Sequence, residues 1–252
     1  MVIVKTKKEI EKMQAAADIL VGVHKGLREI IRPGVTTLEL DAFAEDYIKS
    51  HGAIPAQKGY QGFAYSICAS INEEVCHGFP RKETLKEGDL LTVDMVVDLD
   101  GYMADSAWSY AVGQVSDEVK KLMEVTKECL YLGIDQCYPG KRLGDIGHAI
   151  QSHAEGQGFS VVRQFVGHGI GKNMHEDPQV LHYGQPGRGL RIQEGMVFTI
   201  EPMINAGGWE VVVDKKDGWT ATTMDGSLSC QYEHTIAITK DGPLVLTEQD
   251  RD

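Results

Sequence analysis

The stretch TVDMVVDLDGYMADSAWSY, residues 92–110, decides the fold of this chain. Its Asp100-Gly101 pair lies between two extended apolar runs, which is the strongest short-range signal of a β-hairpin. If these two residues form the loop, residues that face each other have numbers that add to 201, the sum of 100 and 101. Because side chains alternate along a strand, Asp94 and Asp105 then share one face as diagonal neighbours, roughly 7 Å apart. Two carboxylates at this separation on an apolar hairpin predict a positive charge between them.

The composition excludes several classes of protein. The chain has 252 residues and a formal net charge of −12, which disfavours binding to DNA or RNA and suits a cation or a substrate with a positive end. Its apolar runs are too short for a membrane span and its first residues are unlike a signal peptide, so we expect a cytoplasmic protein that does not contact a membrane. The five cysteines are scattered, without a C-x-x-C pair, which indicates a reducing compartment and argues against disulfides or a thiolate zinc site.

Capping signals and apolar spacing predict four helices. Thr6 and Thr36 are each followed by a glutamate at the third position, which is the spacing of a capping box. Apolar residues then recur at helical spacing, and glycine or a Pro-Gly pair ends each helix. Two more helices are expected at 116–137 and 143–155, and strands are expected at 64–71, 160–166, 196–204, 218–223 and 228–239, with a glycine-rich loop at 167–171.

The order helix, helix, strands occurs twice, which predicts an internal duplication. The segment LKEGDLLTVDMVV (85–97) aligns with IQEGMVFTIEPMI (192–204), and this alignment places Asp94 on Glu201. Two such halves would pack around one sheet, with helices outside and a cleft where the halves meet. Carboxylates from both halves would then meet in that cleft. We therefore expect a single catalytic α+β domain over residues 1–252, with halves at about 1–115 and 116–252.

Five residues are candidate ligands of divalent metal ions. Glu201 and Glu233 stand in strand-like apolar runs, an odd place for an unpaired carboxylate, and His168 lies between two glycines that allow close approach. Four clustered carboxylates contain six like-charge pairs, whose repulsion totals on the order of 10 kcal/mol at an effective dielectric constant of about 20. That repulsion is comparable to the stability of a whole domain. Two divalent ions about 3.5–4 Å apart would cancel it. The candidate ligands are Asp94, Asp105, His168, Glu201 and Glu233.

Each candidate ligand also has an ordinary interpretation when it is taken singly. A lone acidic residue in a strand is usually at a sheet edge or in an ion pair, and a lone histidine is most often a surface or capping residue. Only the joint pattern favours a metal site. The sequence therefore assigns no role to five histidines that stand alone, namely His24, His51, His148, His153 and His182.

The residues around these candidates carry a resemblance to a known family. The segments SICASINEEVCHGFP (66–80), FVGHGIGKNMHEDPQV (165–180), FTIEPMI (198–204) and DGWTATTMDGSLSCQYEHT (217–235), together with the hairpin, resemble the type I methionine aminopeptidases of family M24 in their short bacterial form. The segments span most of the chain in the order that this family has. The resemblance implies the pita-bread (creatinase/aminopeptidase) fold, with two pseudo-symmetric α+β halves around a central antiparallel sheet.

The resemblance also implies how the ligands are divided between two metal ions. Asp94 would chelate one ion, His168 and Glu201 would hold the other, and Asp105 and Glu233 would bridge the two. The reaction implied is removal of the initiator methionine from a nascent protein whose second residue is small, by attack of hydroxide on the first peptide bond. The metal is left open among Mn, Fe, Co and Zn. Contact with the ribosome is a family-level expectation, and we expect a monomer.

Substrate-contacting residues follow only from the resemblance. Glu201 would shuttle a proton, and His77 and His175 would contact the peptide. The methionine pocket would be formed by Tyr60, Phe63, Cys68 and Trp219. The chain departs from the usual pattern at three positions, because Gln57 stands where some members have cysteine, and Phe63 and Met174 stand where other aromatics are often found.

Two other functions remain open from the sequence. One is a peptidase of the same fold that is specific for X-Pro bonds, although such relatives usually carry an additional N-terminal domain that this chain is too short to hold. The other is a non-catalytic relative that binds protein or RNA. Such relatives are expected to have lost metal ligands, whereas all five are present here.

Overall fold

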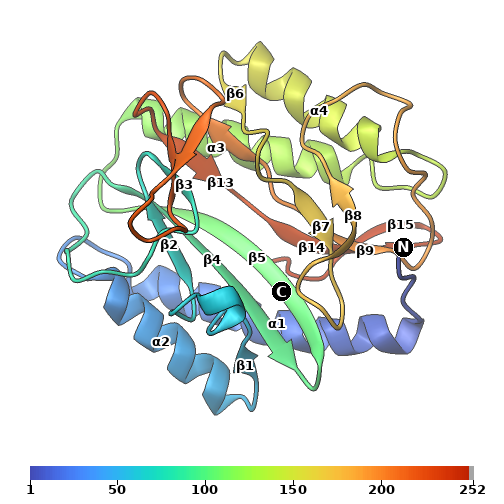
Figure 1. The fold of residues 1–252 in the computed structure, drawn as a ribbon, viewed down its shortest axis with the longest axis horizontal. Helices are drawn as coiled ribbons and strands as arrows, with labels where there is room; N and C mark the ends of the chain where they lie inside the picture. Colours follow the sequence, from blue (N-terminus) through green and yellow to red (C-terminus); the bar gives the residue numbers. More distant parts are fainter. Residues whose placement is uncertain (250–252) are drawn as a thin grey trace.

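Four helices surround the β-sheets, with α1 and α2 at the lower edge of Figure 1 and α3 and α4 at its upper edge. The structure is a computed structural model that describes residues 1–249. The first two helices begin at the predicted capping boxes, in which the threonine hydroxyl accepts the glutamate amide and the glutamate carboxylate accepts the threonine amide. The helices are α1 (Lys7–Ile30), α2 (Thr37–Ser50), α3 (Asp117–Ile134) and α4 (Leu143–Gly156), with a short 3-10 helix, η1 (Tyr60–Gly62).

The predicted hairpin forms the long curved ribbon at the centre of Figure 1, β4 (Leu90–Leu99) and β5 (Tyr102–Ala111). Its register is the predicted one, because Asp94 faces Ala107 and Val96 faces Asp105. Both loop residues, 100 and 101, have positive φ, 53° and 79°, as a two-residue turn of this type requires. Helix α1 packs against the apolar face of the hairpin and leaves the face with the two aspartates free for other contacts.

The fifteen strands within residues 1–249 would be too many for one continuous sheet, and they divide among four sheets instead. The hairpin joins β1 and β2, and the largest sheet has the order β15-β14-β9-β7-β8. Smaller sheets have the orders β13-β10-β6 and β11-β12-β3. The remaining strands are β1 (Ile54–Pro55), β2 (Cys68–Ile71), β3 (Glu74–Cys76), β6 (Ser160–Val161), β7 (Gly167–Gly169), β8 (Glu176–Val180), β9 (Val197–Ile200), β10 (Met203–Asn205), β11 (Val211–Val213), β12 (Ala221–Thr223), β13 (Ser229–Gln231), β14 (His234–Thr239) and β15 (Gly242–Val245).

Two strands that the sequence predicts as continuous are broken, and a candidate ligand lies in each break. Glu201 lies between β9 and β10, and Glu233 lies between β13 and β14. The breaks face each other, because β9 pairs with β14 and β10 pairs with β13 in antiparallel register. Pro202 follows Glu201 and has no amide hydrogen to continue the ladder. The backbone of Glu233 leaves its sheet as well, and its amide donates to the carbonyl of Ala107 on β5 at 2.8 Å.

Several other boundaries differ from the sequence prediction. The strands expected at 64–71 and 160–166 shrink to β2 and β6, and the loop expected at 167–171 contains strand β7. Strand β7 has glycine on both sides of His168 because any larger side chain at these two positions would clash with neighbouring backbone. A Cβ atom at Gly167 would lie 2.5 Å from the carbonyl oxygen of Thr199, and one at Gly169 would lie 2.2 Å from that of Asp177. The two glycines beside His168 therefore allow neighbouring strands of this protein to come close to β7.

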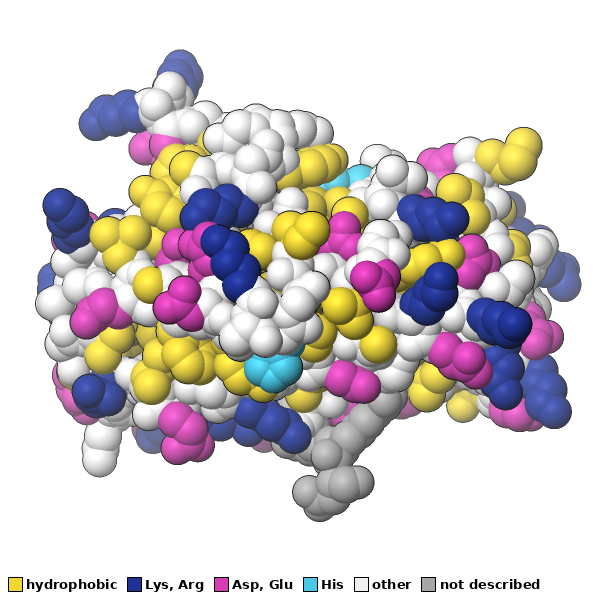
Figure 2. Space-filling view, turned by 90° about the horizontal axis from the view of Figure 1, so that it is seen from below, with side chains coloured by type: hydrophobic (Ala, Val, Ile, Leu, Met, Phe, Trp, Pro, Cys, Tyr) yellow, Lys and Arg dark blue, Asp and Glu magenta, His cyan; other side chains and the backbone are white. Residues whose placement is uncertain are grey.

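The face of the molecule seen in Figure 2 carries charges of both signs. Lysine and arginine side chains are interspersed with aspartate and glutamate, and hydrophobic side chains lie between them. This face therefore produces no large field of a single sign. Within residues 1–249, every helix is too short or too polar to cross a bilayer. The five cysteines are buried as free thiols.

Candidate metal centre and substrate cavity

One cavity of about 730 Å³ collects the residues that the sequence singled out. Strands β4, β5 and β7 and the two strand breaks supply its charged side, and η1, β2 and the segment before β12 supply its aromatic side. Its lining includes every predicted site residue, namely Tyr60, Phe63, Cys68, His77, Asp94, Asp105, His168, His175, Glu201, Trp219 and Glu233. Segments that are distant in the sequence thus converge on one site.

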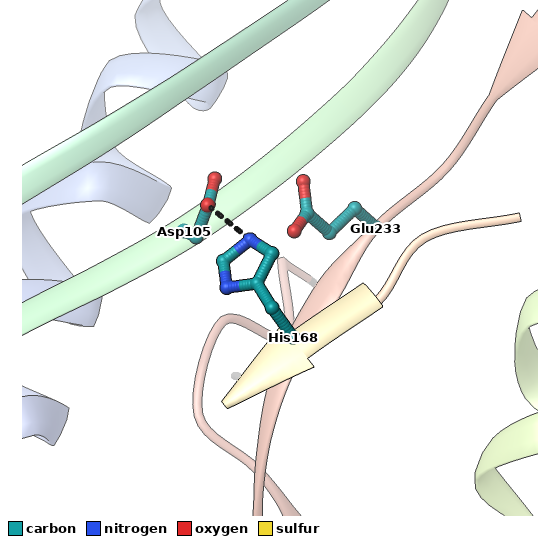
Figure 3. Close-up of side chains that lie close together, drawn as sticks. All are labelled: Asp105, His168 and Glu233. Atoms are coloured by element: carbon teal, nitrogen blue, oxygen red, sulfur yellow. Dashed lines mark ion pairs between the residues drawn. The ribbon is translucent and has the colours of Figure 1, made fainter. Parts of the chain in front are cut away.

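Three of the candidate ligands form the tightest cluster. Asp105, His168 and Glu233 each offer an atom that lies within 4.8 Å of the others, and Figure 3 shows their side chains pointing toward one another from separate segments. The Nε2 atom of His168 lies 3.6 Å from Oδ2 of Asp105 and 3.6 Å from Oε1 of Glu201. Asp94 lines the same cavity from β4.

The imidazole of His168 is oriented so that its Nε2 could bind a metal ion. Burial, followed by the charge of His175, lowers the pKa of His168 to about 4, so the ring is neutral near pH 7. Its Nδ1 lies 3.0 Å from the carbonyl oxygen of Gly169, to which only an N–H can donate. Nε2 therefore carries a lone pair, and this lone pair faces oxygens of Asp105 and Glu201, which offer only lone pairs once they are ionised. A cation between them removes this mismatch.

The carboxylates are strongly perturbed when no cation is present. Burial raises the pKa of Asp94 to about 7 and that of Glu201 to about 8. Burial and the neighbouring carboxylates raise the pKa values of Asp105 and Glu233 well above the ordinary range. Oδ1 of Asp94, Oδ1 of Asp105 and Oε1 of Glu233 are buried without a hydrogen-bond partner. Buried unpaired oxygens are costly, and hard oxygen ligands are what divalent cations take, so this donor set fits such ions.

Two threonines that the sequence did not reveal hold candidate ligands in place. Thr199 on β9 accepts the amide of His168 at 3.0 Å and donates its hydroxyl to Oε1 of Glu201 at 2.7 Å. Thr235 on β14 accepts the amide of Asp105 at 3.0 Å and donates to the Asp105 carbonyl at 2.8 Å. The two threonines face each other across β9 and β14. Their spacing was a usable signal, because T-x-E and E-x-T place each threonine two residues from a glutamate.

Two of the five histidines to which the sequence assigned no role, His24 and His182, are buried rather than surface or capping residues. His182 is fully buried, and its Nε2 accepts the amide of Glu201 at 3.1 Å. Burial lowers the pKa of His182 to about 3, which keeps that nitrogen free to accept. His24 is fully buried on α1, with Nδ1 2.8 Å from the hydroxyl of Tyr110. The apolar residues beside them, Val23 before His24 and Leu181 before His182, were a usable signal of this burial.

Replacing Thr199 with valine should weaken metal binding without unfolding the protein. Valine has the same shape, but it cannot accept the His168 amide or donate to Glu201. Losing such supporting contacts typically costs about 10–100-fold in metal affinity. Titration calorimetry with Mn²⁺ would measure the change. Thr239→Val is the matched control, because that hydroxyl bonds within the β14–β15 turn, and its metal affinity should equal that of the unaltered protein. Equal affinities in both variants would contradict the role of Thr199.

The substrate side of the cavity is aromatic. The hydroxyl of Tyr60 lies 3.0 Å from Nδ1 of His175, and Phe63 packs edge-on against Trp219 with ring centroids 5.2 Å apart. His77 lies with its ring centroid 6.0 Å from that of Trp219. The backbone of His77 has a φ of 57°, in the left-handed region, and such strain in a non-glycine residue is typical of functional sites.

Comparison with known proteins agrees with this site. The model of Metallopeptidase family M24 matches residues 11–240. Methionine aminopeptidase A of Synechocystis sp. is 55% identical over 243 residues, which cover 96% of this chain and 96% of that protein. The crystal structure of methionine aminopeptidase from Rickettsia prowazekii has a TM-score of 0.97 at 47% identity and covers 98% of this chain and 100% of its own.

A more distant likeness extends to the fold alone. The prolidase from Pyrococcus furiosus has a TM-score of 0.80 at 22% identity, and the match covers 99% of this chain and 66% of that one. The shared architecture is the pita-bread fold that the sequence motifs predicted. The family model and the near full-length relatives agree with the buried carboxylate cluster described above. This chain therefore belongs to metallopeptidase family M24, whose members are hydrolases that use divalent metal ions.

Proposed function

We propose that this chain is a metal-dependent methionine aminopeptidase, which removes the N-terminal methionine from new polypeptides when the second residue is small. One observation carries the proposal. A cluster of buried carboxylates and one imidazole shares a cavity with aromatic side chains that suit a thioether. Near full-length relatives that bear the name methionine aminopeptidase support this substrate class.

Two divalent ions are proposed for the acidic side of the cavity. Asp94 would chelate one ion, His168 and Glu201 would hold the other, and Asp105 and Glu233 would bridge them. When bound, such ions lower the pKa of a water molecule toward about 7 and polarise a carbonyl oxygen. The oxygen-rich ligand set suits Mn, Fe or Co, and Zn accepts such ligands as well.

Glu201 is proposed to move the proton. Its Oε1 is held by the Thr199 hydroxyl at 2.7 Å, and its Oε2 lies 3.5 Å from the side-chain amide nitrogen of Gln231. Its position in a strand break leaves the carboxylate facing the cavity. In this position Glu201 would take a proton from the attacking water and deliver it to the leaving amine.

The two proposed substrate histidines are neutral near pH 7. Burial lowers the pKa of His175, and burial with the charge of His175 lowers the pKa of His77 to about 4. We assign the hydroxyl of Tyr60 as the donor to Nδ1 of His175, which leaves a hydrogen on Nε2. That N–H would donate to the oxygen of the tetrahedral intermediate, a contact typically worth about 3–4 kcal/mol in the transition state. His77 would hold the scissile nitrogen.

The methionine side chain would enter the pocket formed by Tyr60, Phe63, Cys68 and Trp219. Phe63 and Cys68 are almost fully buried, with exposed fractions of 3% and 2%. A thioether is flexible and polarisable, and it makes favourable contacts with aromatic rings. Gln57 lines the pocket beside Cys68, and its side-chain nitrogen donates to the carbonyls of Ser66 at 3.2 Å and Asp94 at 3.3 Å when the amide is oriented to satisfy both of its ends. The amide of Gln57 makes the base of the pocket more polar than a cysteine would.

The proposed function also implies where the protein acts, in which oligomeric state and with which domain organisation. N-terminal methionyl peptides and nascent chains would be its substrates, in the cytoplasm and at the ribosome surface during synthesis. We propose that it acts as a monomer and that residues 1–252 form one catalytic domain, with duplicated halves at about 1–115 and 116–252.

Hydrolysis of a Met-Ala-Ser peptide tests the proposed function. The protein would be treated with a chelator, and Mn, Fe, Co and Zn would then be added back in turn. We expect no turnover after chelation, recovery with at least one of these ions, and little hydrolysis of an Ala-Pro peptide. Preferred hydrolysis of Ala-Pro would favour an X-Pro peptidase. Absence of stoichiometric metal and of both activities would favour a non-catalytic binding protein.

A further inference from the structure

A buried ion pair lies directly beside the proposed substrate histidine. Nζ of Lys5 donates to Oε2 of Glu176 at 2.5 Å, and both side chains are only 4% exposed. Glu176 follows His175 in the chain and begins β8. The other lysines that form ion pairs within residues 1–249 are much more exposed, between 43% and 65%. Burying two charges is unfavourable unless they are paired, so this contact is an unusual feature that needs a reason.

The pair joins the N-terminal segment to the loop that carries His175, across 171 residues of sequence. Lys5 lies in the segment before α1. Figure 1 shows the N-terminus beside β8, β9 and β15, which come from the second half of the chain. The amide of Lys5 donates to the carbonyl of Gly195 at 2.7 Å, which attaches this segment to the start of β9. The α-amino group of Met1 pairs with the carboxylate of Asp177, the residue after Glu176.

The carboxylate of Glu176 also closes the loop that carries His175. Its Oε1 accepts the amide of Asn173 at 3.2 Å, and the amide of Gly171 donates to the carbonyl of Asn173 at 3.2 Å. A Cβ atom at Gly171 would lie 2.6 Å from Cε of Lys5, so the lysine stem passes directly over the loop. The loop at 171–176 is thus closed from within by one oxygen of Glu176 and fixed from outside through the other.

His175 depends on this loop for its orientation. The centroid of its ring lies 4.3 Å from that of His168, and its Nδ1 lies 3.0 Å from the hydroxyl oxygen of Tyr60. These contacts orient the ring but do not anchor the backbone that carries it. The backbone after His175 is anchored at Glu176, which pairs with Gly169 between β8 and β7 and whose carboxylate is held by Lys5.

We propose that Lys5 is a positioning residue for His175, and that the buried Lys5–Glu176 pair keeps the 171–176 loop in the one arrangement in which His175 reaches the reacting carbonyl. The inference rests on the proposed function, because the role of His175 is part of it. Positioning residues act mainly on the transition state, since a displacement of about 1 Å can cost about 100-fold in rate.

The experiment is a double-mutant cycle on the metal-loaded full chain with the Met-Ala-Ser peptide. The variants are Lys5→Met, His175→Ala and the double variant. Lys5→Met should lower kcat by about 10–100-fold, change KM by less than about threefold, and leave metal content unchanged. In the His175→Ala background, Lys5→Met should lower kcat no further, because the group it positions is gone. Lys5→Arg should restore most of the kcat, since a guanidinium can pair with the same carboxylate.

Two controls separate positioning from general stability. Lys120→Met removes a lysine that is 65% exposed in its ion pair with Asp117 and should leave kcat unchanged. If Lys5→Met does not fold, Glu176→Gln replaces it in the same cycle, because the amide keeps the shape of the carboxylate and removes its charge.

The outcomes distinguish this inference from the proposed function. An equal fall of kcat in both backgrounds, or an unchanged kcat in a folded Lys5→Met variant, would overturn the positioning role. Failure of the unaltered protein to cleave Met-Ala-Ser would overturn the proposed function instead.

Discussion

Replacing Asp105 with asparagine will abolish metal-supported turnover while the protein stays folded. Asparagine keeps the shape of the side chain on β5 but removes the charge that would bridge two ions. Because loss of a mere supporting contact costs about 10–100-fold in metal affinity, loss of a bridging ligand should lower kcat/KM by more than about 100-fold. Hydrolysis of Met-Ala-Ser at saturating metal would measure the effect, and thermal melting would establish that the variant is folded.

The same substitution should stabilise the fold of the metal-free protein. Burial and the carboxylates of Asp94 and Glu201 raise the pKa of Asp105, so the ionised form is unfavourable in the fold. A neutral asparagine removes part of the repulsion, and the metal-free variant should melt at a higher temperature than the unaltered protein near pH 8. Asp117→Asn is the matched control, because that side chain is 99% exposed and should change neither property. Retained turnover in Asp105→Asn at saturating metal would rule out a bridging role.

The metal-free protein will become less stable as the pH rises from about 6.5 to 9. The folded protein holds Glu201 at a pKa of about 8, above the ordinary value of 4.5, and Asp94 at about 7, above 3.8. A group whose pKa is raised by folding stabilises the fold when protonated, and this contribution is lost as the pH passes through the raised value. Each pKa unit corresponds to about 1.4 kcal/mol, so the total loss is on the order of several kcal/mol.

The pH window is chosen so that histidines do not mask this effect. Burial lowers the pKa values of His24, His77 and His168 to about 4, so these groups make the fold more stable as the pH rises toward their ordinary value of 6.5. Above that pH they are neutral in both folded and unfolded protein. The carboxylates then dominate up to about pH 8, and the buried cysteines, whose pKa values burial raises above 9.0, add to the same loss nearer pH 9. The melting temperature would be measured in chelator and in saturating Mn²⁺, which should reverse the slope because it binds the ionised carboxylates. A flat or rising melting temperature in chelator would contradict the raised pKa values.

The hairpin register could be predicted because two independent rules set it. A two-residue Asp100-Gly101 loop fixes which residues pair, and the period of two fixes the shared face of Asp94 and Asp105. The structure has this register. The capping boxes at Thr6 and Thr36 were equally local, and they also form as predicted. Features that are encoded within a few residues are thus readable from the chain.

The strand breaks at Glu201 and Glu233 could not be predicted in the same way. Their flanks have the apolar, β-branched composition of continuous strands, and the breaks form because paired segments from distant parts of the chain turn both carboxylates into the cavity. The contacts of Lys5 and His182 are also non-local, since their partners lie 171 and 19 residues away. The internal duplication remains a prediction.

Anomalous diffraction from crystals soaked in Mn²⁺ would test the central claim most directly, that buried carboxylates from separate segments converge to hold paired cations. We expect two manganese peaks about 3.5–4 Å apart, in contact with Asp94, Asp105, His168, Glu201 and Glu233. The peak nearest His168 should contact Nε2 rather than Nδ1, because Nδ1 is bound to the carbonyl of Gly169. A map at saturating manganese without peaks in this cavity, or with manganese bound elsewhere on the chain, would contradict the account.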